Sequence, residues 1–202
     1  MSKEIAAKEV AALRARTGAG MMDCKKALQD TGGDMERAAD LLRERGIVKA
    51  EKRGERGAGD GLIGHYVHHD HKTAVIVEVN CETDFVARTD DFKSLVKDVA
   101  IHIAATNPLA VSIDKLPADV VARERAIYEK QVAESGKPEA IRPKIVEGML
   151  RKFYEERVLE EQIFVKDETG KQKVGDLVKA LSAKTGEKIS IRRFARLRVG
   201  EE

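Results

Sequence analysis

The chain has 202 residues, of which 42% are hydrophobic and 36% charged, a composition that indicates a folded core under a charged surface and excludes a disordered chain. Its 37 lysines and arginines nearly balance 35 acidic residues, and a net charge of +2 is too small to drive non-specific nucleic-acid binding. Apolar runs are too short for a membrane span, and the N-terminus lacks the apolar core of a secretory signal, so we expect a cytoplasmic protein without a membrane partner.

The first fifty residues are predicted to form a module of three short helices. Hydrophobic residues recur at helical spacing, and the first helix ends at the glycine-containing loop 17–20. We expect Asp23 and Asp34 to cap the second and third helices and Gly46 to end the third. Residues 1–50 are therefore the first predicted domain.

Residues 51–60 are charged and rich in glycine, without apolar periodicity, which predicts a linker. After it, two apolar and β-branched runs, 62–67 and 73–79, predict a β-hairpin with a polar tip, and the second run is expected to be a central strand. We assign residues 61–202 to one core domain.

The remaining core is predicted to contain long helices and a final strand. A helix starting at Asp90 or Asp91 has the apolar spacing of a face that covers a sheet, and it ends near Asn107. Residues 117–160 predict a projecting helical hairpin, with Pro117 at the start and only a thin apolar stripe on the first arm. Because helices and antiparallel strands are segregated along the chain, the predicted fold class is α+β.

Residues 188–199 predict a surface or edge strand with two unlike faces. The expected division places Ile189, Ile191, Ala195, Leu197 and Val199 on one face and Arg192, Arg196 and Arg198 on the other. Arg193 and Phe194 interrupt this alternation, which is typical of a bulge. The basic face has no interleaved aromatics, which favours a solvated or protein-contacting strand over a phosphate-binding one.

The segment EVNCETDFVAR, residues 78–88, leaves a buried strand and at once presents polar residues around one aromatic. Two interpretations are open: Phe85 packs into the core while Thr83 and Asp84 form an ordinary turn, or Phe85 projects as an anchor for a partner. Aromatic residues are only 4% of the chain and tryptophan is absent, so an aromatic placed on this polar turn favours partner binding.

A second candidate contact is LRARTGAGMMDCKKAL, residues 13–28. Met21 and Met22 are adjacent and cannot both face inward on one short helix, so at least one is expected to be exposed as an adaptable contact. The alternative is that the glycines only turn the chain. The loop lacks the spacing and the Lys-Ser or Lys-Thr pair of a phosphate-binding P-loop.

We expect no metal, no cofactor and no catalytic site. A histidine cluster surrounds the predicted hairpin tip and consists of His65, His68, His69 and His71, beside Asp70, but no separate ligand group accompanies it, which favours a solvated turn. Cys24 and Cys81 form no C-x-x-C pair and are expected to be reduced and buried. No nucleophile motif or catalytic carboxylate pair is recognisable.

The two candidate segments closely resemble both signatures of the elongation factor Ts family, which exchanges the guanine nucleotide on elongation factor Tu. VEGMLRKFYEERVLEEQIFVKD, residues 146–167, and the terminal IRRFARLRVGE also resemble the closing section of that family, so the resemblance spans practically the whole chain. It implies a ubiquitin-associated-like module over residues 1–50, a core domain with a helical hairpin, and a role in translation elongation without a chemical step.

The resemblance also implies which residues bind the partner. The Thr83–Val86 turn would enter the nucleotide-binding domain of GDP-bound elongation factor Tu near its Mg²⁺, with Phe85 inserted and Asp84 beside it, and would promote GDP release until GTP binds. The helical module would hold another face of that domain through Arg14, Thr17, Gly18, Gly20, Met21, Met22 and Lys25.

One departure from the family motivates a further hypothesis. Longer members carry two related core subdomains, whereas this chain has room for one, so we expect a homodimer that replaces the missing contacts; the thin stripe of the hairpin also favours it. Two other functions are weighed against exchange. Scaffolding would need only residues 1–50, and RNA binding through the Arg192–Arg198 face would depend steeply on salt.

Overall fold

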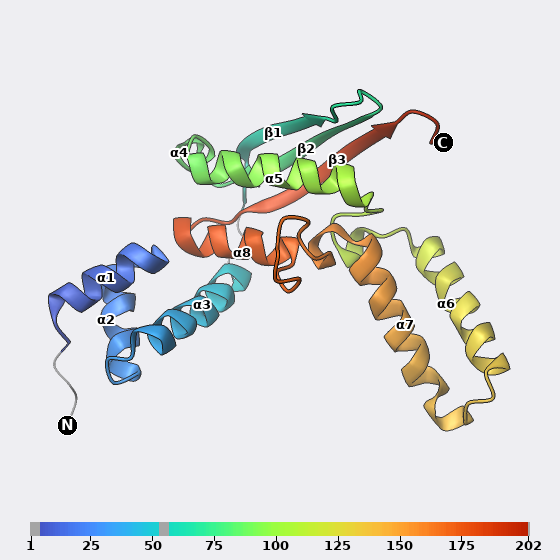
Figure 1. The fold of residues 1–202 in the computed structure, drawn as a ribbon, viewed down its shortest axis with the longest axis horizontal. Helices are drawn as coiled ribbons and strands as arrows, with labels where there is room; N and C mark the ends of the chain where they lie inside the picture. The colour runs from blue at the N-terminus through green and yellow to red at the C-terminus, as the bar shows by residue number, and fades with distance from the viewer. Residues whose placement is uncertain (1–4, 53–56, 202) are drawn as a thin grey trace. The chain divides into compact units, whose positions relative to one another are not determined.

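The computed structural model describes residues 5–52 and 57–201 (Figure 1). These residues divide into two compact units. The first unit contains the described residues up to Gly61 together with 80–93 and 178–190, and the second contains 62–79, 94–177 and the described residues from Ile191 onward. Residues 53–56, inside the predicted linker, lie outside the described residues. The units alternate along the chain, and the domain boundaries at 50 and 61 stay a prediction.

Three helices build the N-terminal part of the first unit: α1 (Ala7–Thr17), α2 (Met21–Asp30) and α3 (Met35–Lys52). Their buried side chains form one hydrophobic cluster, which consists of Val10, Leu13, Cys24, Ala27, Leu28, Ala38 and Leu42. Helix α1 ends at Gly18 because this residue adopts a left-handed φ of 69°, and its N–H donates to the Arg14 carbonyl at 2.8 Å. The glycine loop thus fixes the angle between the first two helices.

Of the three predicted helix signals in this module, one is confirmed. Asp34 caps α3, since its Oδ1 accepts two backbone N–H groups at 3.0 Å each. Asp23 lies inside the first turn of α2, so the prediction that it caps this helix is wrong. Gly46 does not end α3; a Cβ at this position would lie 3.0 Å from the Cβ of Ala183, so the glycine allows close packing instead.

The sheet has three strands, β1 (Asp60–Val67), β2 (Thr73–Cys81) and β3 (Ser190–Arg198), in the order β1-β2-β3. The predicted hairpin and the central position of β2 are confirmed. Alternate side chains of β2 are buried, namely Val75, Val77 and Val79, while Ile76 between them is exposed. Only one face of the central strand is therefore inside the core.

Helix α5 (Asp90–Thr106) covers that buried face (Figure 1). The helix approaches the sheet so closely that a Cβ on Gly64 would lie 2.4 Å from Cγ1 of Val96. The N-terminal cap differs from the prediction of Asp90 or Asp91, because Oγ1 of Thr89 accepts the N–H of Phe92 at 3.3 Å. The sheet and α5 together bury the aliphatic core of the second unit.

Strand β3 contradicts the prediction that its apolar residues share one face. Ile191 is buried, but Leu197 is 74% exposed, while the Arg196 side chain is only 6% exposed and its Nε donates to the Ala104 carbonyl at 3.4 Å. Two consecutive exposed residues at 192–193 shift the alternation by one position, as the predicted bulge would. Beyond that shift Arg196 faces α5, whereas Ala195 and Leu197 face away.

The predicted helical hairpin is present, formed by α6 (Ala118–Glu134) and α7 (Arg142–Arg157) with the short 3₁₀ helix η3 (Glu139–Ile141) between them. Its two arms pack against each other through two small hydrophobic clusters. Their buried residues include Leu116, Val132, Val146, Leu150 and Phe153. Pro117 precedes the first helical residue of α6 instead of starting it. The second arm ends before the predicted residue 160.

Two further 3₁₀ helices, η2 (Ile113–Lys115) and η4 (Leu159–Glu161), the four-residue helix α4 (Asp84–Ala87) and helix α8 (Val174–Thr185) also belong to the fold. A buried polar network fastens α5 to the segment after η4. Nε2 of His102 lies 3.0 Å from Oε1 of Gln162, and its Nδ1 accepts the N–H of Val165 at 3.1 Å. These partners suit a neutral ring with the proton on Nε2, and burial lowers the pKa of His102.

Candidate functional site

The Thr83–Val86 turn emerges directly from the end of the central strand β2. Thr83 has extended backbone angles and begins the four-residue helix α4 (Asp84–Ala87), whose Val86 N–H donates to Oγ1 of Thr83 at 3.5 Å. Phe85 is 78% exposed, more than any other large hydrophobic side chain whose exposure the structure describes. The core-packed interpretation of Phe85 is therefore wrong, and its role as a partner contact stays a prediction.

The neighbours of Phe85 hold the short helix without covering the ring. Oδ2 of Asp84 pairs with the Arg88 guanidinium at 2.7 Å, and both side chains are solvent-accessible. Ala87 is buried and Val86 half-buried, so they face the body of the protein. The turn thus presents an aromatic ring with a carboxylate beside it and an apolar base below it.

Glu187, which no sequence motif singles out, anchors this turn. Oε2 of Glu187 accepts the backbone N–H groups of Glu82 and Thr83 at 3.1 Å each, and its Oε1 accepts the Thr83 hydroxyl at 2.7 Å. Glu187 lies 104 residues after Thr83, between α8 and β3. Local spacing cannot reveal such a contact, because it depends on how these distant segments fold together.

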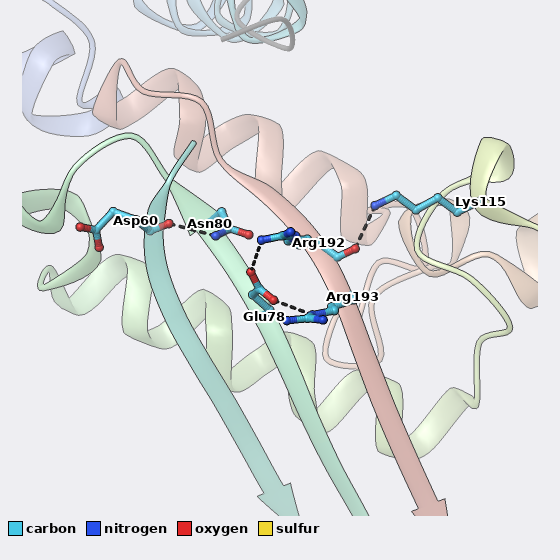
Figure 2. Close-up of polar contacts among 6 residues, drawn as sticks. All are labelled: Asp60, Glu78, Asn80, Lys115, Arg192 and Arg193. Carbon is cyan, nitrogen blue, oxygen red and sulfur yellow. Dashed lines mark hydrogen bonds and ion pairs between the residues drawn. The ribbon is translucent and has the colours of Figure 1, made fainter. Parts of the chain in front are cut away.

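Buried polar groups lie just before the turn. Sγ of Cys81 donates to the Thr83 carbonyl at 3.1 Å, and burial, helped by the charges of Glu187 and Asp60, raises the pKa of the thiol to about 11. Nδ2 of Asn80 donates to the Asp60 carbonyl at 3.1 Å (Figure 2). Cys81 and Cys24 are both buried and unbridged, as predicted.

The candidate residues of the helical module gather at its first loop and the adjoining helix ends. Met21 and Met22 are both exposed, Met22 at 74%, which confirms and extends the prediction that at least one of them is accessible. Arg14 and Lys25 are also exposed. The loop is ordered by Thr17, whose hydroxyl donates to a carbonyl of α1 at 2.8 Å and accepts the N–H of Ala19 at 3.3 Å.

The glycines of the same loop have distinct structural tasks. Gly18 has the left-handed φ that ends α1, while Gly20 is extended and precedes α2. A Cβ on Gly18 would lie 3.1 Å from Cγ of Lys184, whose Nζ pairs with Oδ2 of Asp91 at 2.7 Å. All seven candidate residues of the module and the Thr83–Val86 turn belong to the first unit.

The arginines of β3 are engaged by acidic groups of the second unit. Figure 2 shows the Glu78 carboxylate between two of them, with Arg192 at 3.0 Å and Arg193 at 2.7 Å. The hydrogen bond from Arg193, with that from Arg192, lowers the pKa of Glu78. Lys115 donates to the Arg192 carbonyl at 2.9 Å (Figure 2). Arg196 and Arg198 both pair with Glu201, so two carboxylates offset part of the positive charge of these four arginines.

At the hairpin tip the histidines contact one another and an aromatic hydroxyl. The Tyr66 hydroxyl is 3.0 Å from Nδ1 of His68, and the His68 and His69 rings lie 4.2 Å apart. In the part of the chain that the structure describes, no group of three or more histidine, cysteine, aspartate or glutamate side chains could hold a metal ion. Nor is any described helix both long and apolar enough to cross a membrane.

Comparison with known proteins places the whole chain in one group. A sequence model of the family described as Elongation factor TS matches residues 3–201. The chain is 52% identical over 202 residues to the Elongation factor Ts of Syntrophobacter fumaroxidans, covering 100% of both chains. It is 55% identical to that of Herpetosiphon aurantiacus over 192 residues, 95% of this chain and 96% of the relative. With the protein of that name from Thermosipho melanesiensis the identity is 50% over 98% of this chain and 100% of the relative.

Proposed function

The chain belongs to the elongation factor Ts family of translation elongation factors, and from this we propose that it is a guanine nucleotide exchange factor for elongation factor Tu. It would bind the GDP-bound GTPase in the cytoplasm, promote GDP release and leave when GTP binds. The proposal involves no chemical step. The observation that supports it most directly is the exposure of Phe85 on an anchored turn.

An exposed aromatic side chain on a fixed backbone is suited to act as an anchor in a partner's pocket. Phe85 has two side-chain torsions to immobilise, and the turn that carries it is already ordered by hydrogen bonds to Glu187, so little conformational entropy is lost on docking. Asp84 lies next to it as a polar companion. We propose that this turn enters the partner near the Mg²⁺ that bridges its nucleotide.

Displacement of that ion would explain accelerated release. A bound Mg²⁺ is the largest local positive charge at a nucleotide site, and loops that position it can be shifted by an inserted side chain. Exchange requires that factor and nucleotide weaken each other's binding by one common coupling factor, since this coupling is reciprocal. The same reciprocity lets GTP expel the factor.

The helical module would supply a second contact with the GTPase. Met21 and Met22 give it an exposed, adaptable apolar surface, flanked by the cations Arg14 and Lys25. We propose that the module, ubiquitin-associated-like in type, holds the partner while the turn acts on the nucleotide. Nucleic acid is not a direct ligand in this proposal, which the carboxylate pairing of the β3 arginines supports.

The sheet supports the proposed homodimer. The side chains on the face of β1, β2 and β3 opposite α5 include four exposed aliphatic residues: Ile63, Val67, Ile76 and Leu197. The exposed Val199 directly follows the end of β3. A row of exposed aliphatic residues on one sheet face is typical of an interaction surface. We propose that a second copy of this chain covers it, in place of the second core subdomain of longer relatives.

The exchange function is tested by release of labelled GDP from purified elongation factor Tu. The wild-type protein is expected to accelerate release, and Phe85→Ala to reduce that acceleration by roughly tenfold or more, because removal of an interface anchor costs about 2 kcal/mol. The variant should keep its thermal stability, since the ring is 78% exposed. Ile113→Ala, at an exposed position in η2, is the control that keeps wild-type rates; an unchanged rate for Phe85→Ala would refute the wedge.

A further inference from the structure

We propose that Glu187 is the positioning residue of the Thr83–Val86 turn, holding the backbone in the geometry in which Phe85 acts on the GTPase. This inference rests on the proposed exchange function. It assigns to a residue outside both candidate segments a task that neither of them can perform alone.

The anchor is one carboxylate that receives three donors. Two of them are consecutive backbone N–H groups at the end of β2, and the third is the Thr83 hydroxyl, at distances of 3.1, 3.1 and 2.7 Å. An ionised carboxylate only accepts hydrogen bonds, so it matches this set completely, and bonds to a charged acceptor are the stronger kind. With its proton committed to Glu187, the Thr83 hydroxyl offers a lone pair to the Val86 N–H inside α4.

The contact is reciprocal, which ties the two segments at more than one point. Oε1 of Glu82 accepts the backbone N–H of Lys188 at 2.6 Å, while Glu187 accepts the backbone of Glu82 and Thr83. Each segment therefore satisfies backbone donors of the other. This exchange of bonds fixes both the distance and the register between the two segments.

Glu187 is itself held by the end of α8. Its N–H donates to Oγ1 of Thr185 at 3.4 Å, and its carbonyl accepts the hydroxyl of the buried Ser182. Gly186 before it takes the left-handed φ of 79° that allows the chain to leave the helix. The end of α8, which is far from the turn in sequence, therefore determines the position of the turn through Glu187.

Phe85 cannot hold this position by itself, because its ring has few protein contacts at 78% exposure. If the turn were loose, only a fraction of bound factor molecules would present the ring correctly, and the rate of release at saturation would fall in proportion. The apparent affinity would change less, since the helical module provides a separate contact in the proposed function.

The first test measures GDP release from elongation factor Tu as a function of factor concentration. Glu187→Ala is expected to lower the maximal rate roughly tenfold and to change the half-saturating concentration less than about threefold, as loss of charge-assisted hydrogen bonds predicts. Glu187→Gln keeps the size and one acceptor oxygen, and should recover part of the loss. Glu168→Ala, at an exposed glutamate of the second unit, is the control with wild-type rates.

A double-mutant cycle separates positioning from general structural support. If Glu187 acts through Phe85, GDP release from elongation factor Tu should be no slower with the double variant Phe85→Ala, Glu187→Ala than with Phe85→Ala alone. If the fold-reductions in rate caused by the two single substitutions multiply in the double variant, Glu187 acts independently of Phe85, and the proposal is overturned.

The second test needs no GTPase. Cys81 is buried with its thiol donating to the Thr83 carbonyl, so its alkylation rate, read by mass spectrometry, reports on opening of the turn, while buried Cys24 in the helical module is an internal control. Glu187→Ala should raise the rate at Cys81 roughly tenfold and leave Cys24 unchanged. Loss of the nearby charge contributes to this rise, and Glu187→Gln removes the same charge, so the difference between the two variants measures the opening.

The outcomes distinguish the two levels of argument. A wild-type protein that does not accelerate GDP release would refute the proposed function, and Cys81 protection would still decide whether Glu187 holds the turn. If both cysteines of Glu187→Ala react quickly, that variant has unfolded. The maximal rate and the Cys81 protection of Glu187→Gln then decide the inference. Wild-type maximal rate and wild-type protection of Cys81 in Glu187→Gln and Glu187→Ala would overturn the inference.

Discussion

At Gly64 the sheet and α5 leave no room for a side chain. A Cβ there would lie 2.4 Å from Cγ1 of Val96 and 3.2 Å from Cγ1 of Val77, well inside van der Waals contact. Gly64→Ala therefore forces the helix and the strand apart and is expected to lower the free energy of unfolding by about 1–3 kcal/mol, the usual cost of overpacking. Urea or thermal unfolding measures the change.

Gly148 offers a matched control for this substitution. It lies in the exposed part of α7, and a Cβ there would meet no other atom within 4 Å. Gly148→Ala should raise stability by about 0.5–1 kcal/mol, because alanine loses less conformational freedom than glycine in a helix. Equal effects of the two substitutions would contradict the close approach of α5 to β1.

Between elements, the network around His102 makes stability depend on pH. The ring is fully buried; Gln162, Thr106 and the Val165 backbone supply polar groups around it, and the Phe164 ring lies 6.0 Å away. Protonation would replace the Nδ1 acceptor with a donor facing the Val165 N–H, so the charged ring cannot keep both bonds. Burial accordingly lowers the pKa of His102 below 6.5 in the folded state.

The sign of the pH effect follows from this lowered pKa. Well above pH 6.5 the ring is neutral in both the folded and the unfolded state. As the pH falls through 6.5, the unfolded chain takes up a proton that the folded chain does not yet bind. The free energy of unfolding should therefore fall as the pH drops from about 7 toward 5. Urea unfolding of His102→Asn should show a weaker fall over this range, whereas His65→Gln, at an exposed ring, should keep the wild-type slope. Parallel slopes for all three proteins would exclude His102 as the cause.

Elements with a regular apolar pattern were predictable, since burial follows local periodicity. The covering helix at Asp90–Thr106 and the central strand at Thr73–Cys81 both have such patterns. The alternation of buried and exposed side chains along β3 was not predictable. Its shift at 192–193 depends on Glu78 of the neighbouring strand, which pairs with both Arg192 and Arg193. The exposed turn was selected from its composition, but its anchor Glu187 depends on contacts across 104 residues, which local spacing cannot encode.

For the whole molecule, the unequal faces of the sheet determine how many copies are expected to associate. α5 covers one face, while on the opposite face Ile76 of the central strand is 56% exposed and Ile63, Val67 and Leu197 of the outer strands are exposed as well. Sheets that bury only one face commonly present polar residues on the other, so this aliphatic surface favours a covering partner. A second copy brings the same surface and can bury it by two-fold symmetry.

The proposed dimer is tested by light scattering at micromolar concentration. The wild-type protein should have twice the 22.3 kDa mass of one chain, and Ile76→Arg should have the mass of one, because an arginine at the centre would be buried without a counter-charge in both copies. Ile113→Arg, at an exposed position of the same unit outside the strands of the sheet, should remain dimeric. A single-chain mass for the wild type would exclude the dimer. If Ile76→Arg is monomeric and still accelerates GDP release, each chain carries a complete exchange surface and the second copy serves stability alone.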